Sequence, residues 1–69
     1  MKRFEYATVE WLWDSGNLKI NYGNRIEETE QGSYNELLNL LNRKGREGWE
    51  VVSSSASANW IFWTLKREI

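Results

Sequence analysis

Residues 2–13 carry apolar side chains at both alternating positions of an extended chain. One set is Phe4, Tyr6 and Leu12, and the other is Ala7, Val9, Trp11 and Trp13. The segment is rich in aromatic and β-branched residues and contains neither Gly nor Pro, which predicts a β-strand. A strand that is apolar on both faces belongs in the interior of a sheet.

Apolar and polar residues alternate more strictly in residues 18–22, which predicts a second strand with one solvent-exposed face. The apolar and polar residues fall on opposite faces, Leu18, Ile20 and Tyr22 against Lys19 and Asn21. Residues 14–17, Asp-Ser-Gly-Asn, are typical of a turn, so we expect the two strands to form a hairpin. Residues 23–32 are expected to form a polar connection, within which residues 25–29 are a candidate for a continued strand.

Ser33 predicts the start of a helix, because Glu36 follows it at the spacing of a capping box. Apolar residues then recur along one helical face: Tyr34, Leu37, Leu38 and Leu41, with Leu40 widening the stripe. Gly45 is expected to end the helix in the left-handed conformation, since basic residues suited to a helix C-terminus precede it. Replacing Gly45 by Val is therefore expected to destabilise the fold.

The chain after this helix predicts two more strands. Gly48 is expected to bend the chain back, and Trp49 to lie over the end of the helix and close the core. Residues 49–55 predict the third strand, residues 55–59 a loop of small residues, and residues 60–68 the fourth strand, in which Leu65 is a core candidate.

The expected fold is a single small α+β domain over residues 1–69, with element order β-β-α-β-β. One helix packing on one face of an antiparallel sheet is the simplest arrangement of these elements. The first and fourth strands are apolar on both faces and are expected at the centre. The second and third strands have more polar faces and are expected at the edges.

The segments "FEYATV", "LLNRKGREGWEVVS" and "TLKRE" resemble domain-of-unknown-function family 4177. The matching positions are Leu41, Gly45, Glu47, Gly48, Trp49, Glu50, Val51, Leu65, Lys66 and Arg67. In that family a helix ends in a glycine, a turn of the EGWE type follows, and the chain closes with a strand ending in Leu-Lys-Arg. The resemblance implies this fold and no activity.

Composition removes several classes of function. The chain has no Cys and no His, so disulfides, thiolate metal sites and histidine chemistry are excluded, and no cofactor is expected. A net charge of −1 argues against a nucleic acid or an anionic membrane as partner. The N-terminus lacks the apolar run of a signal peptide, so the expected location is cytoplasmic.

The remaining reactive residues predict no catalytic site, so we expect a protein that is not an enzyme. Residues 53–57 offer serine hydroxyls without a base and are expected to be a tolerant loop. Residues 27–30, Glu-Glu-Thr-Glu, lack the spaced ligands and Gly of a calcium loop and are expected to be a solvated acidic loop. Lys66 and Arg67 point to opposite faces of a strand and form no common basic clamp.

The aromatic residues are the strongest functional signal. Trp60 and Phe62 share one face of the fourth strand, and Ile61, Trp63 and Leu65 share the other. One helix covers only one face, and we expect Trp60 and Phe62 to lie outside, with Trp11 and Trp13 as further candidates for this exposed set. Exposed aromatic patches mark interaction sites.

Three interpretations of this patch are open. The first is a homo-oligomer, with a dimer favoured, that buries sheet against sheet. The second is a different protein partner, or a planar ligand, such as a nucleotide-like molecule, held in an aromatic pocket between subunits. In the third, the loop before Ser33 folds under the sheet and covers the patch within the chain. The expected function is a non-enzymatic binding and self-association module that uses the sheet face opposite the helix.

Overall fold

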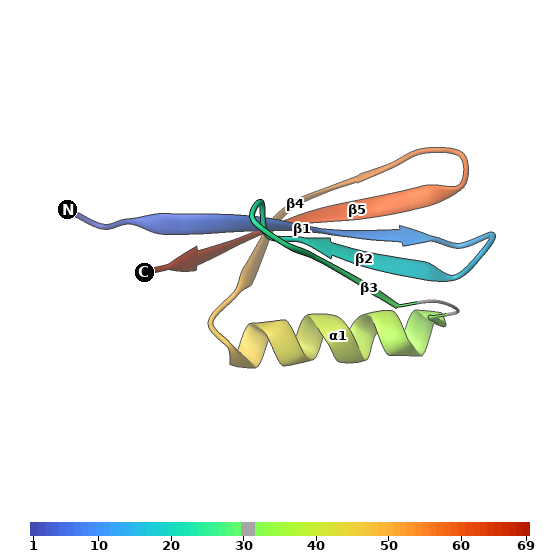
Figure 1. The fold of residues 1–69 in the computed structure, drawn as a ribbon, viewed down its shortest axis with the longest axis horizontal. Helices are drawn as coiled ribbons and strands as arrows, with labels where there is room; N and C mark the ends of the chain where they lie inside the picture. Colours follow the sequence, from blue (N-terminus) through green and yellow to red (C-terminus); the bar gives the residue numbers. More distant parts are fainter. Residues whose placement is uncertain (30–31) are drawn as a thin grey trace.

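A computed structural model describes residues 1–29 and 32–69 of the chain. The elements are β1 (Phe4–Leu12), β2 (Asn17–Asn21), β3 (Ile26–Thr29), α1 (Tyr34–Arg46), β4 (Glu50–Ala56) and β5 (Trp60–Glu68). The strands form one antiparallel sheet in the order β3-β2-β1-β5-β4. Helix α1 lies along one face of this sheet (Figure 1).

The expected order β-β-α-β-β is wrong, because β3 adds a fifth strand before the helix. β3 pairs with β2 along its whole length, with Glu27 opposite Ile20 and Glu28 opposite Lys19. An edge strand is held by backbone hydrogen bonds that any residue makes, so its acidic sequence does not prevent pairing. The second strand, expected at an edge, is therefore internal, and β3 and β4 form the two edges.

The core lies between α1 and the face of the sheet that points toward it. Its buried members are Ala7, Val9, Leu18, Ile20, Leu37, Leu40, Trp49 and Leu65. The positions of Leu65 and Trp49 are those expected from the sequence, with 2% and 5% of their surfaces exposed. Fully burying such a side chain stabilises the fold by about 1.5–3 kcal/mol, so this small set carries most of the hydrophobic stability.

Helix α1 presents a different face to the sheet than its apolar stripe predicts. The buried helical residues are Leu37, Leu40 and Lys44, which recur at three- and four-residue steps. Tyr34 and Leu38 are 57% and 41% exposed instead. The helix is rotated toward Leu40 because the alkyl stem of Lys44 can occupy an apolar position while its ammonium reaches a polar partner.

The two ends of α1 are capped by different means. At the start, the Ser33 hydroxyl oxygen accepts a hydrogen bond from the Glu36 backbone N–H at 3.2 Å, as the sequence predicts. At the other end, Gly48 N–H donates to Gly45 O and Trp49 N–H donates to Lys44 O, each at 3.0 Å. This pair of bonds is a Schellman motif, which requires a left-handed residue after the last helical turn.

Gly48, and not Gly45, is that left-handed residue. Gly48 has φ of +97°, whereas Gly45 lies inside the helix, which continues to Arg46. The expectation that Gly45 ends the helix is therefore wrong, and so is the backbone strain expected of Gly45→Val. The helix continues for one more residue because the bond from Trp49 to Lys44 closes the motif around Gly48.

Replacing Gly45 or Gly48 by alanine should change the stability of the protein in opposite directions. A Cβ at Gly45 meets nothing within 4 Å, so Gly45→Ala should stabilise the protein by about 0.5–1 kcal/mol through helix propensity. Gly48→Ala should destabilise it by about 1–2 kcal/mol, because an L-residue is strained at that φ. Urea denaturation of both variants measures the difference, and equal effects of the two substitutions would contradict the helix end described above.

Candidate functional site

Trp60 and Phe62 lie on the sheet face that points away from α1. We call this the outer face; its β1 and β5 residues are Phe4, Tyr6, Thr8, Glu10, Leu12, Trp60, Phe62, Thr64, Lys66 and Glu68. The two rings contact each other with centroids 5.2 Å apart, and both remain partly exposed. Leu12 is the strand neighbour of Trp60, so these three residues form an apolar cluster at one end of the outer face.

Trp11 and Trp13 do not join this cluster. Trp11 lies opposite Ile61 on the helix side of the sheet, where its Nε1 donates to Gly32 O at 3.0 Å. Its ring contacts Trp13 edge-on at 6.3 Å. The described end of the loop before Ser33 therefore lies over the helix face at Trp11, on the side away from Trp60 and Phe62.

The other end of the outer face is aromatic and charged. Phe4 and Tyr6 are 39% and 58% exposed, and the Lys66 ammonium lies 4.7 Å from the centroid of the Phe4 ring. Lys66 is also paired with Glu50 at 3.3 Å, so it does not act with Arg67, whose ion-pair partner is Glu5 on the opposite face. No described element covers the outer face.

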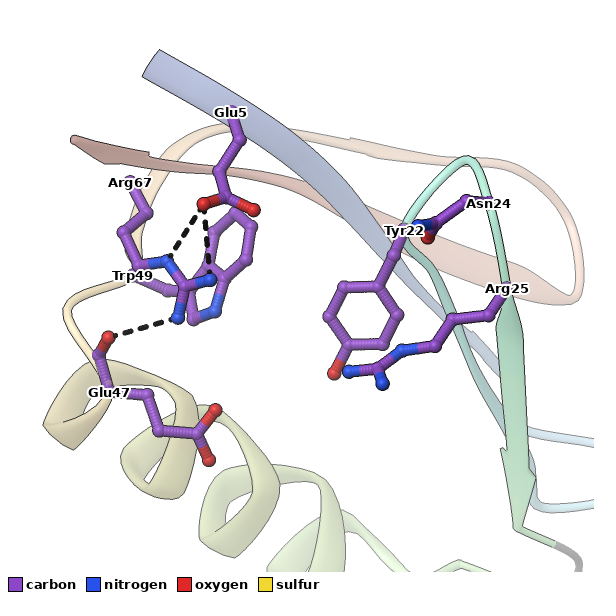
Figure 2. A pocket seen from close by; sticks show the side chains of 7 residues that line it. All are labelled: Glu5, Tyr22, Asn24, Arg25, Glu47, Trp49 and Arg67. Atoms are coloured by element: carbon purple, nitrogen blue, oxygen red, sulfur yellow. Dashed lines mark hydrogen bonds and ion pairs between the residues drawn. The ribbon is translucent and has the colours of Figure 1, made fainter. Parts of the chain in front are cut away.

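A polar pocket that the sequence analysis did not find opens on the helix side, near the C-terminal end of α1 (Figure 2). We call it the Tyr22–Trp49 pocket. It encloses about 230 Å³ and is lined by Glu5, Tyr22, Asn24, Arg25, Glu47, Trp49 and Arg67. These residues come from β1, β5, the turn after β2 and the segment after α1, so only the tertiary fold brings them together.

Arg67 closes one side of the pocket. Its Nε and Nη2 donate to Glu5 Oε2 at 3.4 and 3.1 Å, and its Nη1 donates to Glu47 O at 3.3 Å. The guanidinium also lies over the Trp49 ring, with Cζ 4.4 Å from the centroid. The contact with Glu5 follows from the sheet register, which places the two residues directly opposite each other on β1 and β5.

Arg25 and Lys44 surround Tyr22 on the other side. Arg25 Cζ lies 4.5 Å from the Tyr22 ring centroid and Lys44 Nζ lies 5.3 Å from it. Lys44 Nζ is also 3.3 Å from Glu47 Oε1. Burial alone would lower the pKa of Lys44, but the Tyr22 and Glu47 oxygens favour the ammonium more, so the pKa of Lys44 lies above its ordinary value.

Two buried polar atoms at this site lack hydrogen bonds. The Tyr22 hydroxyl and Trp49 Nε1 are shielded from solvent, and neither makes a hydrogen bond within residues 1–29 and 32–69. The two rings contact each other at 6.1 Å with a tilt of 54°. A buried polar group without a partner costs about 1–3 kcal/mol, so the site keeps unused hydrogen-bonding capacity at a cost in stability.

The serines and glutamates that the sequence singled out lie mainly in the two edge strands, β4 and β3. Residues 1–29 and 32–69 contain no cluster of carboxylates that could hold a metal ion. Ser53, Ser54 and Ser55 lie along β4 and not in a loop, and Glu27 and Glu28 belong to β3, while Glu30 lies outside the described residues. Within the part of the chain described, α1 is too short and polar to cross a membrane.

Comparisons with family models, curated proteins and solved structures found no match to this chain. The resemblance to family 4177 therefore stays a prediction that rests on the motifs alone.

Tyr22→Phe should change the free energy of unfolding by less than about 1 kcal/mol. The substitution removes a buried hydroxyl that makes no described hydrogen bond, but it also removes an oxygen that favours the Lys44 ammonium. The ring between Arg25 and Trp49 is kept. Thermal or urea denaturation measures this change. A loss of more than about 1 kcal/mol would mean that the hydroxyl is hydrogen-bonded in solution.

Proposed function

We propose that the protein is a non-enzymatic binding module that associates with a second copy of itself through the outer face. The observation that carries this proposal is the cluster of Trp60, Phe62 and Leu12 on a sheet face that no described element covers. Partly exposed aromatic residues on a flat surface are typical of the centre of an interface. A chain of 69 residues without cross-links also gains stability from further apolar burial.

The outer face approaches the size of one side of a typical dimer interface. Strand β5 has nine residues, which is about 30 Å of extended chain. Five strands spaced by about 4.8 Å span about 19 Å. The resulting plan area of about 570 Å², enlarged by side-chain relief, approaches the roughly 800 Å² per partner of a typical stable interface.

The charges on this face are compatible with packing against a copy. Lys66 is paired with Glu50 at 3.3 Å, and Lys19 lies 3.9 Å from Glu28. Both lysines are neutralised within the chain. Glu10 and Glu68 of the outer face have no described ion pair, and salt screens the repulsion between these exposed carboxylates and those of a second sheet. The exposed apolar residues on the helix side, Leu38 and Val51 among them, are divided between α1 and β4 and form a less continuous surface.

The absence of enzymatic activity is part of the proposal. It is supported by the lack of His and Cys and by the state of Lys44, whose raised pKa keeps the amine protonated and unsuited to act as base or nucleophile. A ligand stacked in an aromatic pocket between subunits has no specific support here, because the Tyr22–Trp49 pocket is formed within one chain.

The wild-type protein should be a dimer or a higher oligomer at micromolar concentration. Replacing Trp60 by Thr and Phe62 by Ser should give a folded but less stable monomer, because threonine keeps strand propensity while the apolar contact is lost. Light scattering over a wide concentration range measures the mass, and circular dichroism reports whether the fold is kept.

Leu38→Gln is the matched control for this experiment. It also removes an exposed apolar side chain, since Leu38 is 41% exposed, but on α1 and away from the outer face. We expect it to keep the oligomer. A wild-type protein that is monomeric at all concentrations would refute self-association, and an oligomer lost in Leu38→Gln but kept in the double variant would place the contact on the helix side.

A further inference from the structure

We propose that the Tyr22–Trp49 pocket is a binding site for a small anion that carries a carboxylate or phosphate group. This inference goes beyond self-association and is independent of it, because every lining residue belongs to the same chain. The argument rests on which polar groups of the pocket are already paired and which are not.

The two carboxylates that line the pocket are already neutralised within the chain. Glu5 accepts two hydrogen bonds from Arg67, and Glu47 pairs with Lys44 at 3.3 Å. Neither carboxylate therefore creates a demand for a bound cation. Arg67 donates two hydrogen bonds to Glu5 and one to Glu47 O, which uses three of its N–H groups.

The groups with capacity left are mainly donors. Arg25 has one described ion-pair partner, Glu27 at 3.7 Å, and no described hydrogen bond. The Tyr22 hydroxyl and Trp49 Nε1 are buried and donate no described hydrogen bond, and Trp49 is only 5% exposed. An excess of donors beside a guanidinium favours a ligand rich in acceptors, and carboxylate and phosphate oxygens are the acceptors that Arg binds most strongly.

The aromatic faces exclude a stacked ring as the ligand. Arg25 lies over the Tyr22 ring and Arg67 over the Trp49 ring, at 4.5 and 4.4 Å from the centroids. Figure 2 shows the two guanidinium groups at opposite sides of the site. The Tyr22 and Trp49 rings each have a guanidinium on one face and contact each other. Neither ring therefore has a free face on which a nucleobase could stack.

The dimensions of the site fit a small anion. The volume of about 230 Å³ leaves room for an anion of the size of acetate or phosphate. The Arg25 side chain is 65% exposed and stands at the rim, so it can meet a ligand from solvent. Stacking on Tyr22 restrains the guanidinium plane, which lowers the entropy lost when the anion binds.

Nuclear magnetic resonance titration of the full chain tests the site. The probes are inorganic phosphate and acetate, each added at constant ionic strength with chloride as reference. The signal is the indole N–H resonance of Trp49, which is assigned by its absence from the spectrum of Trp49→Phe. We expect a saturable shift of this signal with at least one probe and none with chloride. A response to phosphate alone identifies a phosphorylated ligand, and a response to acetate alone identifies a carboxylate.

Arg25→Gln and Arg43→Gln form the matched pair of variants. Both remove one exposed arginine charge, but Arg43 lies on α1 outside this pocket. Arg25→Gln should weaken binding at least about tenfold and Arg43→Gln less than about twofold. The proposal is overturned if neither probe gives a saturable shift, or if both variants weaken binding equally, which would indicate unspecific charge attraction.

Discussion

The antiparallel pairing of β1 with β5 is the constraint on which the rest of the structure depends. It joins the two ends of the chain through nine register pairs, from Phe4 opposite Glu68 to Leu12 opposite Trp60. A shift of one residue would move every side chain to the other face. Val9 and Leu65 would then leave the core, and the contact of Glu5 with Arg67 would be lost.

The same register divides the aromatic residues between two roles. Trp63 and Trp11 lie on the helix side and pack against the core, whereas Trp60 and Phe62 lie on the outer face. One helix of 13 residues cannot cover both faces of a five-stranded sheet. The architecture therefore leaves an apolar surface of the sheet uncovered. The proposed self-association would bury this surface.

The end of α1 connects this architecture to the pocket. The Schellman motif around Gly48 directs Trp49 into the core, where its ring meets Tyr22. Lys44 supplies a carbonyl oxygen to that motif, and its buried ammonium lies beside Tyr22 and Glu47. A local backbone motif thus sets the position of the aromatic and cationic groups that line the Tyr22–Trp49 pocket.

Local sequence signals were sufficient for several features of this protein. The alternation in residues 60–68 predicted which residues of β5 share a face, and Ser33 with Glu36 predicted the helix start. These features depend on side-chain periodicity and on contacts within a few residues, which the chain itself displays. The signal at β3 was weak because an edge strand is held mainly by backbone bonds to its neighbour, and its side chains need not alternate in polarity.

The sequence by itself determined that the protein has a helix on an antiparallel sheet, a core that includes Trp49 and Leu65, and no cysteine or histidine chemistry. Only the tertiary structure decided which glycine turns the chain, since both Gly45 and Gly48 suit a helix end and the bond from Trp49 to Lys44 selects Gly48. It also decided the burial of Lys44 and the meeting of Arg25, Tyr22, Trp49 and Arg67. Tyr22 and Arg25 are close in the chain, but Trp49 and Arg67 are far from them. No local pattern encodes a site whose members come together only when the strands pair and the helix docks.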